Sequence, residues 1–231
     1  MRINRLALRQ WILYSVALLL VGCAIQHKMQ YETALPPTPV RDVLFSGQEA
    51  PPGFGAYGYL IFTKRPTDDD FSRYIGVCAA FNRNLEPVSD YPPSSWPQIM
   101  PTYWLAKNRG GIDNRHPDCQ RWVEFYDYSR AKTIASAAKV LSSKGPILVA
   151  WSQPFEKAGN DETALVLDLS GFSDDDLDRA FGIWMDRITR DPEIWHAGFN
   201  VVLAKEAFRS FLERYGDNII KAVKTVKEII G

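Results

Sequence analysis

Histidine and cysteine are scarce in this sequence, with three of each among 231 residues. Zinc sites are built from these two residue types, and no spacing of them here resembles a zinc site. Two runs of three aspartates, at 68–70 and 174–176, lack the alternating oxygen ligands and the glycine of a calcium loop. We therefore expect neither a metal site nor a bound cofactor.

Motifs of common catalytic centres are also missing. There is no Gly-x-Ser-x-Gly segment, which presents the nucleophile of many hydrolases, and no glycine-rich phosphate-binding loop. Ser152 and His196 form a triad with an aspartate only if folding brings them together, and the same holds for paired carboxylates such as Glu124 and Glu193. Because any chain of this size offers such combinations, we expect a protein without catalytic activity.

The sequence has no excess of basic residues, since 27 lysines and arginines balance 27 aspartates and glutamates. Proteins that bind nucleic acid usually carry a clustered positive charge that attracts the phosphates. We therefore expect no DNA or RNA partner.

An apolar stretch near the start of the chain, Trp11 to Val21, follows three arginines, Arg2, Arg5 and Arg9. It is short for a membrane-spanning helix, which needs roughly 20 apolar residues, and it fits the hydrophobic region of a signal peptide. The stretch ends in Leu20-Val21-Gly22-Cys23, and this order resembles a bacterial lipoprotein signal peptide with its lipobox. An uncleaved membrane anchor is the alternative. In both cases the arginines stay in the cytoplasm and the rest of the chain is exported.

The lipoprotein resemblance implies that residues 1–22 are removed and that the thiol of Cys23 is acylated, with palmitate among the acyl chains. Membrane lipid is then a partner of the mature protein, and several acyl chains bind it far more firmly than one. In this family an aspartate after the cysteine is associated with inner-membrane retention, and Ala24 stands there instead. We therefore expect a protein on the periplasmic side of the cell envelope, attached to the outer membrane. Without its signal peptide the body has 24 basic and 27 acidic residues, a net charge of −3.

The other two cysteines, Cys78 and Cys119, form an even pair in an oxidising compartment. We expect one structural disulfide between them, and closing a loop of about 40 residues is worth about 4 kcal/mol in the chain-entropy model. A redox-active pair is the alternative, although redox cysteines are usually close in sequence, as in Cys-x-x-Cys.

Prolines are concentrated ahead of the main body, where they remove amide donors and favour an extended backbone. They are Pro36, Pro37, Pro39, Pro51 and Pro52. The expected organisation is a signal peptide at 1–22, a lipidated cysteine and proline-rich tether at 23–55, an α/β domain at 56–200, and a helical extension packed on it at 201–231.

Hydrophobic periodicity predicts strands at 57–63, 99–105, 147–151 and 164–169. Pro101 places the second of these at an edge of the sheet or makes its start irregular. Helices are expected after Thr67 and Ser173, each with three aspartates in its first turn, at 129–143, and in two stretches after residue 203. Residues 122–126 fit either a strand or a helix.

The resulting order β-α-β-α-β-β-α predicts an α/β fold with a mixed sheet covered by helices and a helical C-terminal extension. This order is similar to that of the thioredoxin fold, and Gly145-Pro146 precedes the third strand, where that family has a cis-proline. The segment after the first strand, Lys64 to Thr67, contains no cysteine. The resemblance therefore implies the fold without thioredoxin chemistry at that position.

Two tryptophans, Trp96 in a proline-rich loop and Trp195 after Pro192, are least explained by helix or strand packing and are candidates for a contact surface. Taken together, the sequence predicts a lipid-anchored envelope protein that binds or scaffolds an envelope protein or glycan. One alternative is a thioredoxin-like thiol–disulfide protein that uses Cys78 and Cys119. Another is a glycan-binding or glycan-modifying protein.

Overall fold

The computed structural model describes residues 38–110, 112–141, 145–158 and 164–190, together with 202–203, 206 and 223–225. All of them belong to one compact unit, Pro36–Gly231. The predictions for the signal peptide, Cys23 and Trp195 lie outside the described residues. The strands are β1 (Thr38–Phe45), β2 (Tyr57–Ile61), β3 (Ile99–Ala106), β4 (Ile147–Trp151), β5 (Leu165–Asp168) and β6 (Val223–Thr225). The α-helices are α2 (Phe71–Asn84), α3 (Cys119–Glu124), α4 (Tyr128–Ala137) and α5 (Leu177–Arg190). Short 3-10 helices are η1 (Val88–Asp90), η2 (Pro93–Gln98), η3 (Leu169–Gly171) and η4 (Asp174–Asp176).

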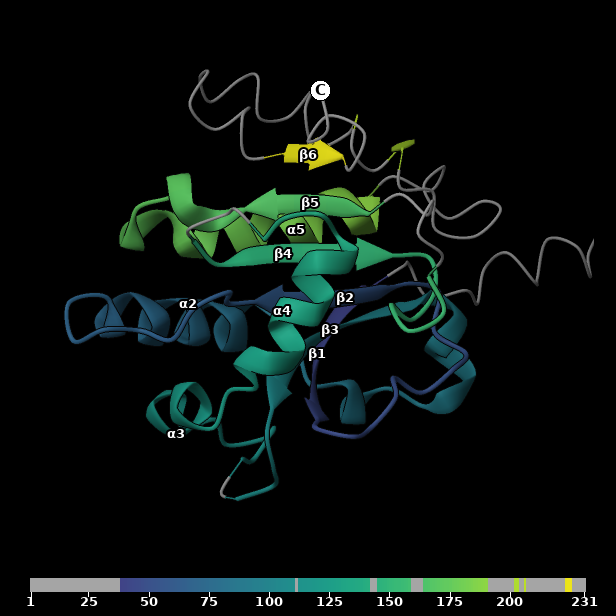
Figure 1. Cartoon of the computed structure of the whole chain (residues 1–231). Helices are drawn as coiled ribbons and strands as arrows, with labels where there is room; N and C mark the ends of the chain where they lie inside the picture. Colours follow the sequence, from purple (N-terminus) through teal and green to yellow (C-terminus); the bar gives the residue numbers. More distant parts are fainter. Residues whose placement is uncertain are drawn as a thin grey trace, which may run out of the picture. The chain divides into compact units, whose positions relative to one another are not determined.

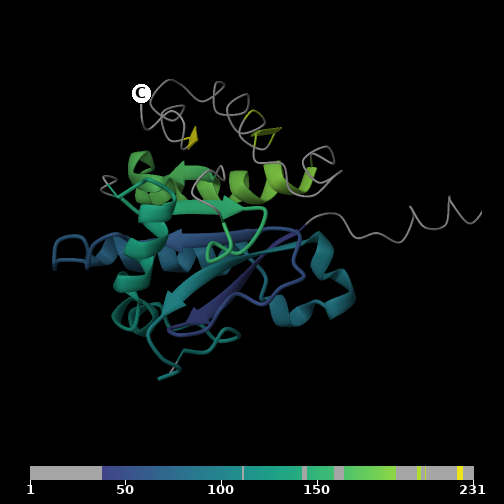
Figure 2. The same cartoon turned by 45° about the vertical axis from the view of Figure 1, so that its right-hand side comes forward.

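The strands form one mixed sheet in the order β1-β3-β2-β4-β5-β6 (Figure 1). Strands β1, β3 and β2 are parallel to one another, whereas β4, β5 and β6 each run antiparallel to the preceding neighbour in the sheet. Helix α4 crosses one face of the sheet and α5 lies on the other, as Figures 1 and 2 both show. The predicted α/β class with a mixed sheet covered by helices is therefore confirmed.

The predicted order β-α-β-α-β-β-α is present as β2, α2, β3, α4, β4, β5 and α5, with α3 inserted before α4. This is the element order on which the similarity to the thioredoxin fold rests. One expectation from that similarity is wrong: no peptide bond is cis in the parts of the chain that the structure describes, so the bond before Pro146 is trans. Gly145 has a different reason to be glycine, because a Cβ there would lie 2.3 Å from the Cβ of Ser170.

The predicted tether at 23–55 is wrong for its last part, because residues 38–45 form strand β1. This strand pairs with β3 over all eight of its residues, and it buries Val40 and Leu44. Ala50 and Phe54 are buried as well, so the segment after β1 packs on the domain. Pro39 is compatible with a strand here because β1 lies at the edge of the sheet, where one side needs no ladder hydrogen bonds.

The prediction that Pro101 places its strand at an edge is also wrong. Strand β3 lies between β1 and β2, and all of its residues are buried. Pro101 faces Val40 of β1 and comes one residue before the first pair with β2, Gly58↔Thr102. The missing amide hydrogen therefore falls where β3 has only one neighbouring strand.

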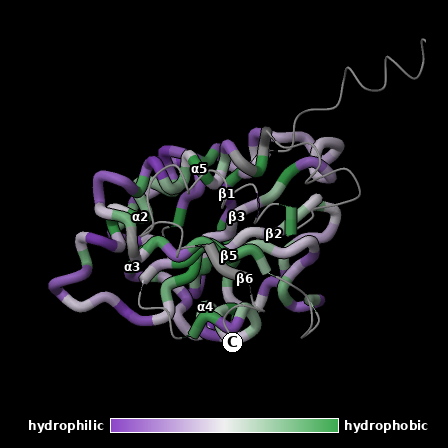
Figure 3. The backbone as a smooth tube through the Cα atoms, turned by 90° about the horizontal axis from the view of Figure 1, so that it is seen from above, coloured by the Kyte–Doolittle hydropathy of each residue, from purple (hydrophilic) through white to green (hydrophobic). Residues whose placement is uncertain are grey.

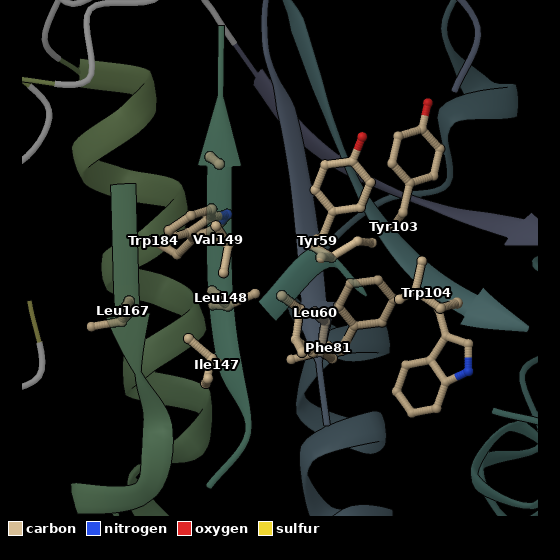
Figure 4. Packing of buried hydrophobic residues seen from close by; sticks show 14 of the residues in the cluster. Tyr59, Leu60, Phe81, Tyr103, Trp104, Ile147, Leu148, Val149, Leu167 and Trp184 are labelled. Carbon is tan, nitrogen blue, oxygen red and sulfur yellow. The ribbon is translucent and has the colours of Figure 1, made fainter. Parts of the chain in front are cut away.

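Aromatic side chains fill the core on the α2 side of the sheet. Phe81 of α2 lies against Leu60 and Trp104 (Figure 4), and its ring centre is 6.0 Å from that of Trp104. The Nε1–H of Trp104 donates to the backbone oxygen of Trp122 at 3.2 Å. Aromatic pairs such as Phe81 and Trp104 stabilise the fold by about 0.5–1.5 kcal/mol each beyond the effect of the buried area. Hydrophobic residues gather in the central part of the molecule and hydrophilic ones follow the outer loops (Figure 3).

Helix boundaries differ from the prediction in their details. Asp70 is the N-cap of α2, and its carboxylate accepts hydrogen bonds from the amide and hydroxyl of Thr67, so the aspartates at 68–70 precede the helix. The second run, at 174–176, forms the 3-10 turn η4 directly before α5. Residues 223–225 were expected in a helix and form β6 instead. Most of the predicted extension at 201–231 lies outside the described residues.

Strand β1 is an edge strand, and the amides on its outer side donate to acceptors that do not belong to a neighbouring strand. Arg41 N donates to Glu86 O at 2.8 Å, Val43 N to the carboxylate of Asp42 at 2.8 Å, and Phe45 N to the side chain of Gln48 at 3.1 Å. Capping of this kind keeps an edge from pairing with another chain.

Asp42 is half-buried at this edge. Desolvation raises its pKa to about 6, although the hydrogen bond from Val43 opposes the rise. Between the pKa of the unfolded chain, near 4, and this value the folded state holds a proton that the unfolded state has lost. The contribution of Asp42 to stability therefore decreases as the pH rises through this range.

We expect the Asp42→Asn variant to gain stability relative to the parent protein between pH 4 and pH 7, by about 2–3 kcal/mol. The amide oxygen of asparagine can still accept the hydrogen bond from Val43, while the cost of burying a charge disappears. Urea unfolding of both proteins at a series of pH values measures the difference. A difference that does not change with pH would contradict the raised pKa.

Candidate functional site

A pocket of about 430 Å³ opens where β2 and β3 end. Its lining consists of Arg65 and Pro66 after β2, Phe71 of α2, Gln120, Val123 and Glu124 of α3, and Tyr128 of α4. We call this site the Arg65 pocket. In open α/β sheets, ligands usually bind outside the carboxyl ends of the parallel strands, and the Arg65 pocket lies at that edge.

The segment that carries Arg65 is fixed on both sides of that residue. Phe62 follows β2 and stacks on Tyr74 of α2, with ring centres 4.4 Å apart. The hydroxyl of Tyr74 donates to the backbone oxygen of Lys64 at 2.9 Å, and the ammonium of Lys64 pairs with Asp70 at 2.6 Å. These contacts give the Arg65 backbone a fixed position between β2 and α2.

The opposite wall is attached to the sheet by Tyr126, which is fully buried. Its hydroxyl donates to Leu60 O at 2.7 Å and accepts from Phe62 N at 3.1 Å, so one side chain joins the α3–α4 connection to the end of β2. Asp127 N donates to Leu105 O at 3.0 Å, which joins the same connection to β3.

Helix α3 has only six residues and depends on its ends for stability. The side chain of Asp118 accepts hydrogen bonds from Gln120 N and Arg121 N at its N-terminus. Cys119, the first residue of the helix, forms a disulfide with Cys78 of α2. Isolated helices of this length are unstable in water, so these contacts position Gln120 and Glu124 at the pocket.

The Arg65 pocket contains charged side chains of both signs, which are exposed to solvent and form no ion pair within the described part of the chain. The guanidinium of Arg65 lies 5.8 Å from the ring centre of Tyr128, and within the described ranges neither Arg65 nor Glu124 forms an ion pair. Burial raises the pKa of the Tyr128 hydroxyl, which donates to Val123 O at 3.3 Å. The tyrosine is therefore neutral, and the charged groups of the lining are one cation and one carboxylate.

A second pocket of about 420 Å³ is lined by residues from three segments, 46–49, 127–133 and 155–156. Its cation, Arg130, is already occupied by protein groups. Arg130 donates to Phe45 O at 2.9 Å and pairs with Glu156 at 2.7 Å. These contacts attach α4 to the end of β1 and give Arg130 a structural role, so the Arg65 pocket is the stronger candidate for a binding site.

The predicted disulfide is confirmed. Cys78 and Cys119 are joined, with their Cα atoms 5.6 Å apart, and Cys78 is fully buried. The bond links α2 to α3, which both contribute residues to the Arg65 pocket. Its burial favours the structural interpretation over a redox-active pair, because thiol exchange needs access of an attacking thiolate to a sulfur.

Trp96, one of the two tryptophans predicted at a contact surface, stacks on Phe54 with ring centres 4.5 Å apart. Its indole N–H is buried and has no hydrogen-bond partner. This packing accounts for Trp96 without a ligand, and Trp195 lies outside the described residues. The prediction of a contact surface at these residues stays a prediction.

Other candidates from the sequence can be placed in part. Ser152 is exposed at the end of β4, whereas His196 and Glu193 lie outside the described residues. Among the residues that the structure describes, no group of three or more His, Cys, Asp or Glu side chains is arranged to hold a metal ion. No helix in the described part of the chain combines the length and the hydropathy needed to cross a bilayer.

The chain matches no protein-family model, no curated protein sequence and no solved structure. The argument for a site therefore rests on the geometry alone. The sequence prediction missed the Arg65 pocket because its lining comes from four separate segments. One local signal was present, since Lys64-Arg65-Pro66 directly follows a buried strand.

Replacing both cysteines in the Cys78→Ala/Cys119→Ala variant should lower the free energy of unfolding by about 4 kcal/mol, because 41 residues separate them and the cross-link restricts the unfolded chain. Urea unfolding measures the loss, and the parent protein unfolded with a reductant is the control.

Alkylation of the native protein in mild reductant should leave both cysteines protected until the protein unfolds. Rapid labelling of the folded protein would instead support the redox alternative.

Proposed function

We propose that this protein is a lipid-anchored component of the cell envelope whose α/β domain binds another envelope component at the Arg65 pocket, without catalysis. One observation carries the proposal for the site: the pocket lies at the carboxyl edge of the parallel strands and contains Arg65, Gln120 and Glu124, whose polar groups have no partner in the described protein. Unpaired polar groups in a cavity at this edge are available to a ligand.

Thiol–disulfide chemistry is a weaker explanation of the same site. Residues 64–67 connect β2 to α2, and none of them is a cysteine. The disulfide between Cys78 and Cys119 connects two helices and does not line the pocket, and one of its sulfurs belongs to a fully buried residue. A binding role uses the groups that the pocket contains, whereas a redox role needs a thiol that its lining lacks.

The anchoring part of the proposal rests on the sequence from Arg2 to Cys23. A disulfide between Cys78 and Cys119 is consistent with an exported protein, because such bonds persist in oxidising compartments and are rare in the cytosol. Strand β1 begins 15 residues after Cys23, so only a short segment separates the proposed lipid from the domain.

The Cys23→Ala variant should either keep its signal segment uncleaved or lack the acyl chains, because the residue that receives the lipid is gone. Mass spectrometry of the purified protein and fractionation of the envelope measure this. The parent protein should start at an acylated Cys23 and sediment with the outer membrane. An unmodified Cys23 on a chain that still begins at residue 1 would contradict the proposal.

A photoreactive amino acid at position 120 of the full-length protein should form a discrete cross-linked product in intact cells, because this side chain faces the pocket. The matched control places the same group at Arg121, the next residue on α3, which is exposed and does not line the pocket. The Phe71→Ala variant should reduce the product at position 120 severalfold. Identical products at positions 120 and 121 would contradict a site in the pocket.

A further inference from the structure

We infer that the ligand of the Arg65 pocket is an amino acid or the end of a short peptide that carries an ammonium and a carboxylate together. This inference rests on the proposed function, in which the pocket is the binding site, and it names the chemical class of the ligand.

The first argument is the pair of opposite charges in one lining. Arg65 and Glu124 line the same pocket, yet they do not pair with each other, so their nearest charged atoms are more than 4.0 Å apart. A ligand with a negative group for Arg65 and a positive group for Glu124 would give each of them a partner. A guanidinium binds a carboxylate through two parallel hydrogen bonds, which makes this pairing specific in geometry as well as in charge.

The second argument is the apolar part of the same lining. Val123 is buried, and Phe71 and Pro66 are half-buried. An aliphatic or aromatic side chain of the ligand would cover this surface. The amide of Gln120, which has no partner in the described protein, can bond to a peptide group of the ligand. The volume, about 430 Å³, lies in the range of about 300–1,000 Å³ that is usual for small-molecule sites.

Other classes of ligand fit these groups less well. A phosphate or an anionic lipid headgroup would meet the carboxylate of Glu124, and Lys64, the nearest other cation in sequence, is paired with Asp70. A metal ion would find a single carboxylate in the lining. A neutral sugar would offer neither residue an opposite charge. A ligand of both charges pairs with Arg65 and Glu124 at once.

The test uses the detergent-solubilised full-length protein and three probes: the dipeptide alanyl-phenylalanine, its N-acetylated form and its C-terminal amide. Titration calorimetry should show saturable binding of the free dipeptide, and each blocked form should bind about tenfold more weakly, since each loses one charge-assisted hydrogen bond.

Two variants assign each charge to its residue. Arg65→Gln should bind the free dipeptide and its amide equally, while it still prefers the free amine over the acetylated form. Glu124→Gln should show the reverse pattern. Arg121→Gln, on the same helix, and Asp175→Asn, an exposed acid of η4, are controls that should behave as the parent protein.

Circular dichroism and thermal unfolding of each variant establish that it is folded, and the pattern of preferences does not depend on absolute affinity. If the dipeptide does not bind, or if Arg65→Gln keeps the parent's preference for the free carboxylate, the inference is overturned. If the dipeptide result fails but the cross-link at position 120 is still formed, the pocket binds another class of ligand. If both the dipeptide binding and the cross-link are absent, the pocket is not a binding site.

Discussion

The end of strand β2 is held by one buried side chain, and the candidate site depends on it. Tyr126 is bonded to the backbone on both sides of Ile61, through Leu60 O and Phe62 N, and so it couples the α3–α4 connection to the central sheet. Its pKa is raised by burial, which keeps the hydroxyl protonated and able to donate. This contact adds to the pairing of β2 with β3 and to the Cys78–Cys119 disulfide, which also hold the two walls of the Arg65 pocket in place. A buried hydroxyl left without these partners would also carry the full cost of its desolvation.

Much of the architecture follows from local sequence patterns. The short apolar runs that form β2, β4 and β5 and the helix α5 after Ser173 are recognisable because each depends on residues close in the chain. The edge strand β1 was missed because Pro39 and the prolines on either side of the strand resemble those of a flexible segment. What decides its state is the pairing with β3, about 60 residues later, and the burial of Val40 and Leu44. The same limit applies to Pro101, whose effect depends on which strands flank it.

The candidate site was less predictable than the fold for a related reason. A disulfide partner can be inferred from the number of cysteines and the compartment, and the pair Cys78 and Cys119 was found in this way. A pocket lined by Arg65, Phe71, Glu124 and Tyr128 needs the relative position of four segments, which no periodicity contains. Trp96 shows a related limit, because an aromatic residue in a proline-rich loop suggests a contact surface, while its stacking on Phe54 appears only in the folded structure.

The disulfide between Cys78 and Cys119 bears on both the proposed compartment and the proposed site. Helix α3 is too short to be stable by itself, and it contributes three of the seven lining residues of the pocket. Its first residue is Cys119, so the bond to Cys78 determines where Gln120 and Glu124 lie relative to α2 and Phe71. A chain that folds in a reducing compartment would lack this restraint and would have to position α3 by the Asp118 cap, by packing of Trp122 and by the contacts of Tyr126 with β2. The geometry of the pocket is therefore one that an oxidising compartment favours. The envelope location proposed from Cys23 and the site proposed from Arg65 and Glu124 are both consistent with this disulfide.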